Sequence, residues 1–319
     1  MENNTCEPEC RHKRWVAHGQ RRKRCAHCGK TRTMRKKRRG RKRRRVGTLP
    51  LARYLNGKSV RTPSRMLGRS RDLFLRTTPW PDVSGLSGPC ILIADALHIR
   101  TRTYRLVVHV ILIASAQDDR AWILPVHFGT KSESGESWAQ AFECALSAEP
   151  RTRIEGLVCD GRQGLLGYAR QQGWVVQRCQ FHLIARLQSL RSVRALSRHR
   201  ADGRTLHALA KTVFTTRSMD DCTCTVRLLE RRAAIEPNRH LRTVVSGLVK
   251  HHQDYRTYLN RSDLCLPYTT NAVESVNSLI RRLMRNMRGF ENETSARAWI
   301  EALLKHRRYI RLTRHRKSA

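Results

Sequence analysis

The chain contains 319 residues, which is enough for one sizeable hydrophobic core plus one or two small modules. It has 64 Lys and Arg against 25 Asp and Glu, and the formal net charge of +39 would make the chain repel itself unless a polyanion, for which nucleic acid is the first candidate, balances it. The most apolar segment, residues 106–116, is about half of the roughly 20 residues that a membrane span requires, and residues 1–9 contain no apolar signal segment, so we expect a cytoplasmic protein without membrane association.

Four of the eleven cysteines lie within the first 28 residues as two pairs, Cys6-x3-Cys10 and Cys25-x2-Cys28. Two such pairs can supply four thiolates to one tetrahedral Zn²⁺, and a segment this short and polar has no core of its own to hold it folded. We therefore predict a zinc ribbon with one structural Zn²⁺ over residues 1–34. The alternative is a disordered tail that carries incidental thiols.

Residues 35–46 are almost continuously basic. Such a run cannot form a core, so we expect an arm that binds the phosphates of double-stranded DNA without reading its bases. The side chains assigned to this contact are Arg35, Lys36, Lys37, Arg38, Arg39, Arg41, Lys42, Arg43, Arg44 and Arg45.

Residues 47–88 contain two short helical patterns, Leu49–Leu55 and Pro63–Leu75, separated by a turn signal at residues 56–58. The patterns fit either a helix-turn-helix or a featureless linker. In the first interpretation the helix over residues 64–75 faces the DNA groove. The arginines that it would present there are Arg65, Arg69 and Arg71.

From residue 89 to residue 182 strand and helix patterns follow one another. Three segments rich in β-branched residues predict an antiparallel meander, and a helix, a strand, a helix and a strand come after them. This order is that of an RNase H-like core, so we predict an α/β fold with a mixed five-stranded sheet and flanking helices. The predicted strands are Ile91–Ile99, Arg105–Ala114, Ala121–Phe128, Ile154–Cys159 and Trp174–Arg178, and the predicted helices are Ser134–Ala148 and Leu165–Gln172.

Two carboxylates occupy unusual places in these strands. Asp95 interrupts the apolar run of the first strand, and Asp160 directly follows the fourth. A carboxylate in an apolar strand costs several kcal/mol to desolvate unless it has a partner, which is either an arginine, such as Arg100 or Arg102, or a metal ion. In the predicted fold the first strand is central and the fourth lies next to it. We therefore expect Asp95 and Asp160 side by side, where a cation would relieve their repulsion.

Glu274 is the third candidate ligand, and it lies in a predicted helix on a polar face beside an apolar stripe. That stripe consists of Val273, Val276, Ile280 and Leu283. Three carboxylates favour a hard divalent ion, so the implied metal is Mg²⁺, with Mn²⁺ as a substitute. The chemistry that uses such a site is in-line phosphoryl transfer with two metal ions, and it requires no histidine base.

Four motifs in succession resemble the catalytic domain of Mutator-type DDE transposases of bacterial insertion sequences, in a variant with an N-terminal zinc ribbon. They are Ile-Ala-Asp95, Val-Cys-Asp160-Gly-Arg, Cys179-x-x-His182 and Thr269-Thr-Asn-Ala-Val-Glu274-Ser-Val-Asn. The resemblance covers roughly residue 89 to the C-terminus. It implies that Asp95, Asp160 and Glu274 are the catalytic metal ligands, that an all-helical insertion occupies residues 183–268, and that residues 269–319 return to the core and end in a basic tail.

The implied activity is two-metal cleavage of DNA at the ends of a mobile element, followed by transfer of the freed 3′-hydroxyl to target DNA. The implied partners are the terminal repeats, the target DNA and at least one further copy of the chain. One alternative is an RNase H-like nuclease or resolvase. The other is a non-catalytic zinc-ribbon DNA-binding regulator derived from a transposase, which leaves the placement of the three acids unexplained.

The role of Cys179 and His182 stays open at this point. One Cys and one His make half of a zinc site, and no second pair lies nearby in the sequence, so we do not count them as metal ligands. They either orient the catalytic pocket or the DNA, or they serve packing.

Overall fold

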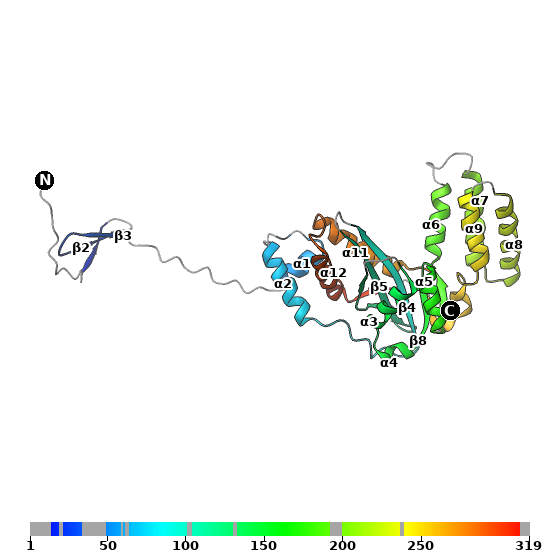
Figure 1. The fold of residues 1–319 in the computed structure, drawn as a ribbon, viewed down its shortest axis with the longest axis horizontal. Coiled ribbons are helices and arrows are strands. Elements are labelled where there is room, and N and C mark those ends of the chain that lie inside the picture. Colours follow the sequence, from blue (N-terminus) through cyan, green and yellow to red (C-terminus); the bar gives the residue numbers. More distant parts are fainter. Residues whose placement is uncertain are drawn as a thin grey trace. The chain divides into compact units, whose positions relative to one another are not determined.

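The structure is a computed structural model that describes residues 14–18, 22–33, 49–58, 60, 64–100, 104–129, 133–191, 200–236 and 239–312. The chain divides into two compact units, residues 1–46 and residues 47–319. Each unit contains its own β-sheet (Figure 1).

The described part of the first unit is a small antiparallel sheet with the strand order β1-β2-β3. Its strands are β1 (Trp15–Ala17), β2 (Arg22–Cys25) and β3 (Thr31–Thr33). A tight turn connects β2 to β3, in which Gly29 adopts a φ of +70° and donates a 3.1 Å hydrogen bond to the carbonyl oxygen of Cys25. The turn holds the end of β2 close to the start of β3.

Within the described residues the second unit is built on a seven-stranded mixed sheet with the order β10-β6-β5-β4-β8-β9, and β7 also pairs with β5. β4 and β5 form a long antiparallel hairpin, whereas β4 pairs with β8, and β8 with β9, in parallel. The strands are β4 (Cys90–Arg100), β5 (Arg105–Ser115), β6 (Arg120–Ile123), β7 (His127–Gly129), β8 (Ile154–Cys159), β9 (Val175–Arg178) and β10 (Tyr309–Arg311).

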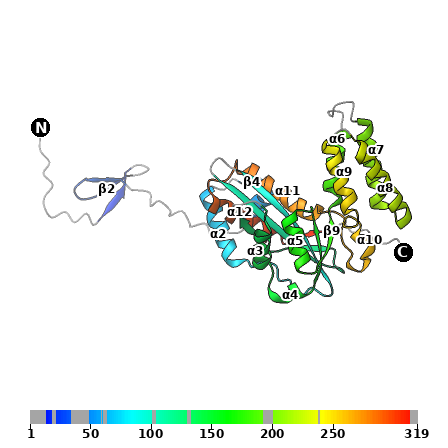
Figure 2. The same ribbon diagram turned by 45° about the vertical axis from the view of Figure 1, so that its right-hand side comes forward.

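Helices cover both faces of this sheet because the side chains of β4 alternate between two hydrophobic clusters. Ile91 and Ile93 pack on one face with helices α1, α2, α11 and α12, while Leu92 and Ala94 pack on the other with α3 and α5 (Figure 2). The helices are α1 (Leu49–Leu55), α2 (Ser64–Thr77), α3 (Gly135–Ala145), α5 (Gln163–Gln171), α11 (Asn271–Asn286) and α12 (Glu293–Arg307), and the short α4 (Ala148–Thr152) precedes β8. By this alternation Asp95 faces the cluster that contains α11.

The described elements between β9 and α11 are all helical. α6, α7, α8 and α9 pack together around an apolar cluster of their own, which includes Leu187, Leu229 and Leu248. Their bounds are α6 (Gln180–Arg191), α7 (Arg200–Thr215), α8 (Met219–Ile235) and α9 (Arg239–His251); α10 (Thr257–Asn260) and a 3₁₀ turn (Ser262–Leu264) lead back toward α11. We refer to α6–α9 as the helical segment.

The region over residues 47–88 is not a featureless linker. α1 and α2 both contact α12, and Leu51, Leu55 and Leu67 are buried in the main core. The guanidinium of Arg71 forms a 2.6 Å ion pair with Asp72 and lies 5.0 Å from the centre of the Trp299 ring on α12. The helix-turn-helix interpretation and its DNA contacts through Arg65, Arg69 and Arg71 stay predictions.

The prediction of five strands was wrong in two places. The third predicted strand is interrupted at residues 124–126, where Pro125 cannot donate to the ladder, and becomes β6 and β7. β10 forms where the sequence indicated only a helix and a basic tail, and its pairing of Tyr309 with Trp122 extends the sheet by one edge strand. A strand of three residues is too short to show the alternation by which strands are predicted.

Candidate active site

The three predicted acids come from neighbouring elements of the second unit. β4 and β8 are parallel, and their register pairs Ile93 with Val158. Asp95 lies two residues after Ile93, within β4, and Asp160 lies two residues after Val158, directly beyond the end of β8. α11 contacts β4 and β5, and Glu274 lies in its first turn. The expected adjacency of Asp95 and Asp160 is thus a consequence of the strand register.

Asp95 is the acid that this environment perturbs most strongly. Burial raises the pKa of its carboxyl group, and the charges of Glu274 and Asp160 raise it further, to about 7. Among the described residues, which include Arg100 but not Arg102, no arginine forms an ion pair with Asp95. A buried acid whose ionisation two other acids oppose is a place where a cation is strongly favoured.

Asn277 is a site residue that the sequence analysis missed. Its side chain is fully buried, and Nδ2 donates a 2.8 Å hydrogen bond to Oδ2 of Asp95. Within the described part of the chain its Oδ1 atom is buried without a hydrogen-bond partner. A buried amide oxygen without a hydrogen-bond partner lowers the stability of the folded state. The hydrogen bond from Asn277 Nδ2 to Asp95 offsets part of that loss. The available signal was an Asn in the apolar stripe of the Glu274 helix.

The Cys179-x-x-His182 motif connects the end of β9 to the start of α11. Thr270 lies next to α11, and both its backbone N–H and its hydroxyl donate to Sγ of Cys179 at 3.2 Å. Nε2 of His182 lies 3.2 Å from Oε1 of Glu274. These contacts join both motif residues to the glutamate helix and support the orienting role over simple packing.

The same contacts set the charges of this group. Burial would raise the pKa of the Cys179 thiol, but hydrogen bonds from His182 and Thr270 lower it below its ordinary value. Hydrogen bonds with Cys179 and then with Glu274 raise the pKa of His182 to about 10. The hydrogen bond from His182 in turn lowers the pKa of Glu274. At neutral pH the site therefore contains an imidazolium beside an ionised Glu274.

Two exposed arginines border the acids. Nε of Arg162 lies 3.3 Å from Oδ2 of Asp160, and the backbone N–H of the same arginine donates to Oδ1 of Asp160 at 3.0 Å. Nη1 of Arg281 lies 3.9 Å from Oε2 of Glu274. Because both side chains are at least half exposed, they are able to turn toward a phosphate without unpacking the core.

As the side chains stand, the described residues contain no group of three or more His, Cys, Asp or Glu arranged to hold a metal ion. Asp160 and Glu274 are paired with Arg162 and His182 instead. The donor set still fits a hard divalent ion, because all three groups offer carboxylate oxygens and because the charge of Asp95 is opposed by the other two acids.

The predicted zinc ligands lie only partly within the described residues. Cys25 is buried at the end of β2, and Cys28 lies in the turn that follows, so both are on one tight knuckle. Cys6 and Cys10, and the basic arm over residues 35–45, lie outside the described residues.

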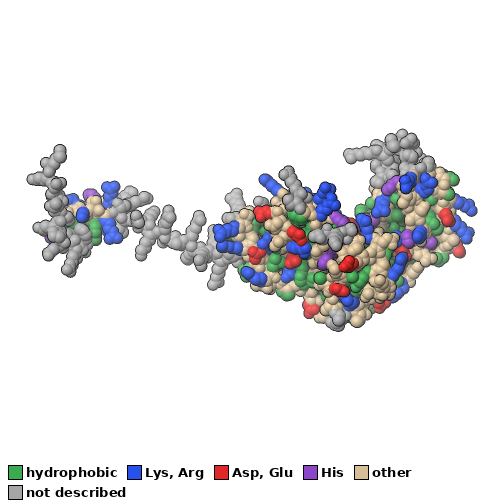
Figure 3. All heavy atoms as spheres, in the orientation of Figure 1, with side chains coloured by type: hydrophobic (Ala, Val, Ile, Leu, Met, Phe, Trp, Pro, Cys, Tyr) green, Lys and Arg blue, Asp and Glu red, His purple; other side chains and the backbone are tan. Residues whose placement is uncertain are grey.

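The surface of the second unit is rich in arginine and lysine. On the face shown in Figure 3 their side chains are spread over both the helical segment and the part of the core near α2. Across the described residues, no helix is both long and apolar enough to span a membrane.

Comparison with known protein families identifies the family of this chain. The family model described as "Transposase, Mutator family" matches residues 88–311, a range that includes the three acids, the Cys179-x-x-His182 motif and the helical segment. No curated protein matches the chain.

Proposed function

Because the chain belongs to the Mutator family of transposases, we propose that it is a DDE transposase in which Asp95, Asp160 and Glu274 form one site for DNA cleavage and strand transfer. The observation that carries this proposal is the convergence of the three carboxylates, expressed in the pKa of Asp95, which burial and the other two acids raise to about 7. Nothing in the folding of a strand requires such an arrangement, whereas phosphoryl transfer does.

The sheet supports an RNase H-like assignment of the core. The order β6-β5-β4-β8-β9 combines an antiparallel meander with two parallel strands; Asp95 lies within β4, and Asp160 directly follows the neighbouring strand β8. Residues 89–182 and 269–319 then form the catalytic core, and residues 183–268 form the helical insertion.

Asp95, Asp160 and Glu274 would hold two Mg²⁺, with Mn²⁺ as a substitute. When bound, the ions lower the pKa of the attacking water or 3′-hydroxyl and neutralise the leaving oxygen. Asn277 fixes the orientation of Asp95, and His182 fixes that of Glu274. Arg162 and Arg281 are placed to leave their carboxylate partners and bind the phosphates that flank the cut.

We assign the first unit to DNA binding. Cys6, Cys10, Cys25 and Cys28 would hold one structural Zn²⁺, and the arm over residues 35–46 would add affinity for DNA phosphates that does not depend on sequence. Two element ends must be joined to one target, so the active form is a dimer or a larger assembly.

The test is Mg²⁺-dependent cleavage and joining of a labelled duplex that carries the DNA flanking the gene. We expect Glu274→Gln to abolish both reactions and to retain DNA binding. Glu143→Gln, which neutralises an exposed Glu on α3, is the matched control and should behave as the wild type.

The outcomes separate the rival functions. Cleavage without joining by the wild-type protein would indicate a nuclease or a resolvase. Tight binding without any reaction in Mg²⁺ or Mn²⁺ would indicate a DNA-binding regulator. Full activity of Glu274→Gln would remove that residue from the site.

A further inference from the structure

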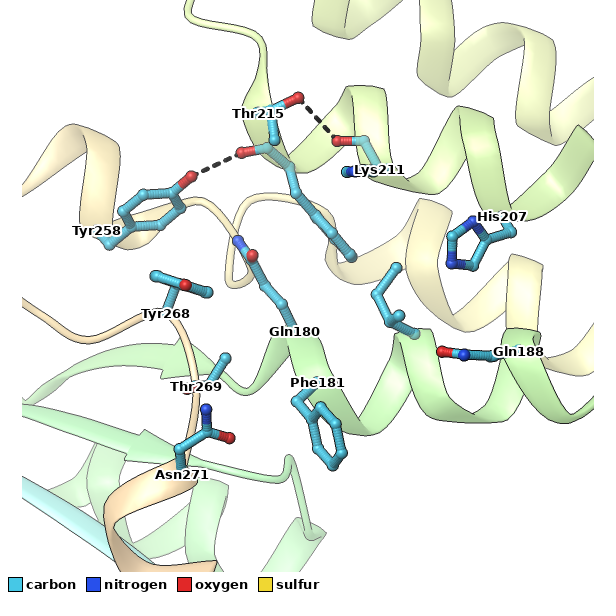
Figure 4. Close-up of a pocket in the computed structure, with 12 residues that line it drawn as sticks. Gln180, Phe181, Gln188, His207, Lys211, Thr215, Tyr258, Tyr268, Thr269 and Asn271 are labelled. Atoms are coloured by element: carbon cyan, nitrogen blue, oxygen red, sulfur yellow. Dashed lines mark hydrogen bonds between the residues drawn. The ribbon is translucent and has the colours of Figure 1, made fainter. Parts of the chain in front are cut away.

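A cavity of about 550 Å³ lies beside the proposed active site, and none of the roles assigned above uses it. Its walls come from α6, from α7 and from the segment that leads into α11 (Figure 4). This volume falls within the roughly 300–1,000 Å³ of pockets that hold small organic ligands. The cavity is large enough for one nucleotide.

The cavity is close to the catalytic acids along two elements. Asn271 lies on its wall and precedes Glu274 by three positions in α11, which corresponds to about 4.5 Å along the helix axis. Phe181 also lies on its wall and directly precedes His182, the partner of Glu274. Neighbouring bases in one strand are separated by about 3.4 Å along the helix axis. A strand cut at the acids therefore has its adjacent nucleotide within reach of the cavity.

The lining combines the groups that recognise a nucleotide. It contains the aromatic rings of Phe181, Tyr258 and Tyr268 together with side-chain amides and hydroxyls, and Lys211 supplies a cation. None of the described residues that line it is acidic. Aromatic rings stack on bases of any sequence, amides bind base edges, and a cation balances a phosphate. This combination favours a nucleotide over an apolar peptide.

Phe181 is a residue of the cavity wall whose side chain remains exposed to solvent. Its side chain is 50% exposed although it is a large apolar ring. The wall around it is fixed by hydrogen bonds, since Gln180 Nε2 donates to the carbonyl oxygen of Tyr255 and the Tyr258 hydroxyl donates to that of Phe214, both at 2.8 Å. A rigid wall with one exposed ring at its edge is suited to stacking, because little order has to be gained on binding.

We propose that this cavity binds one unstacked nucleobase of the DNA strand next to the cleavage point, stacked on the ring of Phe181, and thereby positions that strand at the catalytic acids. This proposal rests on the proposed function, because it assumes that the bound strand is the DNA strand that the transposase cleaves. Taking a base out of a duplex costs a few kcal/mol, which is smallest at ends and mismatches. The cavity would therefore favour DNA whose ends open readily.

The experiment compares two probes of equal charge on the full-length protein without divalent metal. One is a twelve-nucleotide oligothymidylate, and the other is the same backbone with every base removed. The phosphate contacts of the basic surface are common to both probes, so the difference in affinity reports base contacts. Phe181→Ala tests the stacking, Phe181→Trp is the conservative replacement, and Leu228→Ala removes a comparably exposed apolar side chain from α8 as the control.

We expect Phe181→Ala to weaken oligothymidylate binding about 10-fold, near the lower end of base–aromatic stacking, and to leave the abasic probe unaffected. Phe181→Trp and Leu228→Ala should bind both probes as the wild type does. An equal loss for both probes, or no loss for either, would overturn the proposal. If Phe181→Ala loses affinity only for oligothymidylate but the wild type cleaves no DNA, the nucleobase site is supported and the transposase activity is rejected. If the wild type cleaves DNA but Phe181→Ala shows no such base-dependent loss of affinity, the transposase activity is supported and the nucleobase site is rejected.

Discussion

The central sheet and the helical segment each contain side chains in places that do not stabilise the fold, but the kinds of side chain differ. The sheet buries an acid, Asp95, and a histidine, His109, inside strands that are otherwise apolar. The helical segment has an apolar core of its own and keeps most of its charges outside, but it exposes the aromatic ring of Phe181. A buried charge in one region and an exposed ring in the other are both costly for the isolated chain. Under the proposed function, the sheet would provide the catalytic acids and the helical segment would hold the substrate.

The largest expected effect comes from neutralising an acid of the sheet. Asp160→Asn should reduce DNA cleavage by at least about a thousandfold, or about 4 kcal/mol of transition-state stabilisation, because a ligand charge is lost. Asp95→Asn should have the same effect and should also raise the thermal midpoint of the metal-free protein, since it removes a carboxyl group whose ionisation is opposed. Cleavage rates and melting curves check both. A lower midpoint for Asp95→Asn would contradict the view that its charge is unfavourable without metal.

The second prediction contrasts a histidine of the sheet with one of the helical segment. Burial, followed by the charge of His127, lowers the pKa of His109 from 6.5 to about 4. The unfolded state therefore binds the proton first as pH falls, so His109 contributes stability that is present above pH 6.5 and is lost progressively as pH falls toward 4. This corresponds to about 3 kcal/mol.

Denaturant titrations between pH 7 and pH 4 test this contribution. His109→Phe should flatten the decline in the free energy of unfolding over that range. His240→Phe, at an exposed position of α9, should leave the decline as it is in the wild type. An unchanged decline in the His109 variant would show that other groups account for acid destabilisation.

A third prediction concerns the junction between the two regions. Arg256 is buried, and its Nη1 donates to the backbone carbonyl oxygens of Val213 and Thr216 at the end of α7. Arg256→Met would leave these carbonyls without their donor and should cost about 2 kcal/mol of stability. Amide hydrogen exchange should then speed up in α7 but not in β4 and β5.

The control for the junction is Arg261→Ala. Arg261 forms exposed ion pairs with Glu155 and Asp263, which contribute little in water. We expect Arg261→Ala to leave amide hydrogen exchange in α7 unchanged. Equal acceleration in the sheet and in α7 for Arg256→Met would mean that the two regions unfold as one.

The smallest expected effect is at His182. Its contact with Glu274 orients the carboxylate but touches no reacting atom, so His182→Gln should lower kcat for cleavage about 10-fold with little change in DNA affinity. His252→Gln, outside the site, serves as the control. A change in DNA affinity without a change in kcat would assign His182 to substrate binding.

The sequence was sufficient for the strands that build the site. β4, β5 and β8 are long or strongly apolar, and Asp95 and Asp160 stand out against them, so their adjacency followed from strand order. Asn277 could not be found in the same way, because an amide in a helix acquires a role only through the partner it reaches, 182 residues away in sequence. The contact of Arg71 with the Trp299 ring could not be predicted for a similar reason, because that ring lies on a helix far away in sequence.

The cavity beside the acids was also beyond sequence analysis. Its wall residues belong to three separate segments, and Phe181 looks in sequence like an ordinary hydrophobic residue of the Cys179-x-x-His182 motif. Only the packing of α6 against α7 shows that this ring faces a cavity and remains exposed. Patterns along a chain indicate which face of an element is apolar, but not which apolar side chains the fold leaves uncovered.

The central claim is that three carboxylates from separate elements together hold the divalent ions, and binding of Mn²⁺ tests it most directly. Electron paramagnetic resonance of free Mn²⁺ would measure its affinity for the wild type, for Asp95→Asn, Asp160→Asn and Glu274→Gln, and for the control Glu143→Gln. We predict that each of the three site variants weakens binding at least about 10-fold and that the control does not. Equal affinity in all five proteins would contradict the claim.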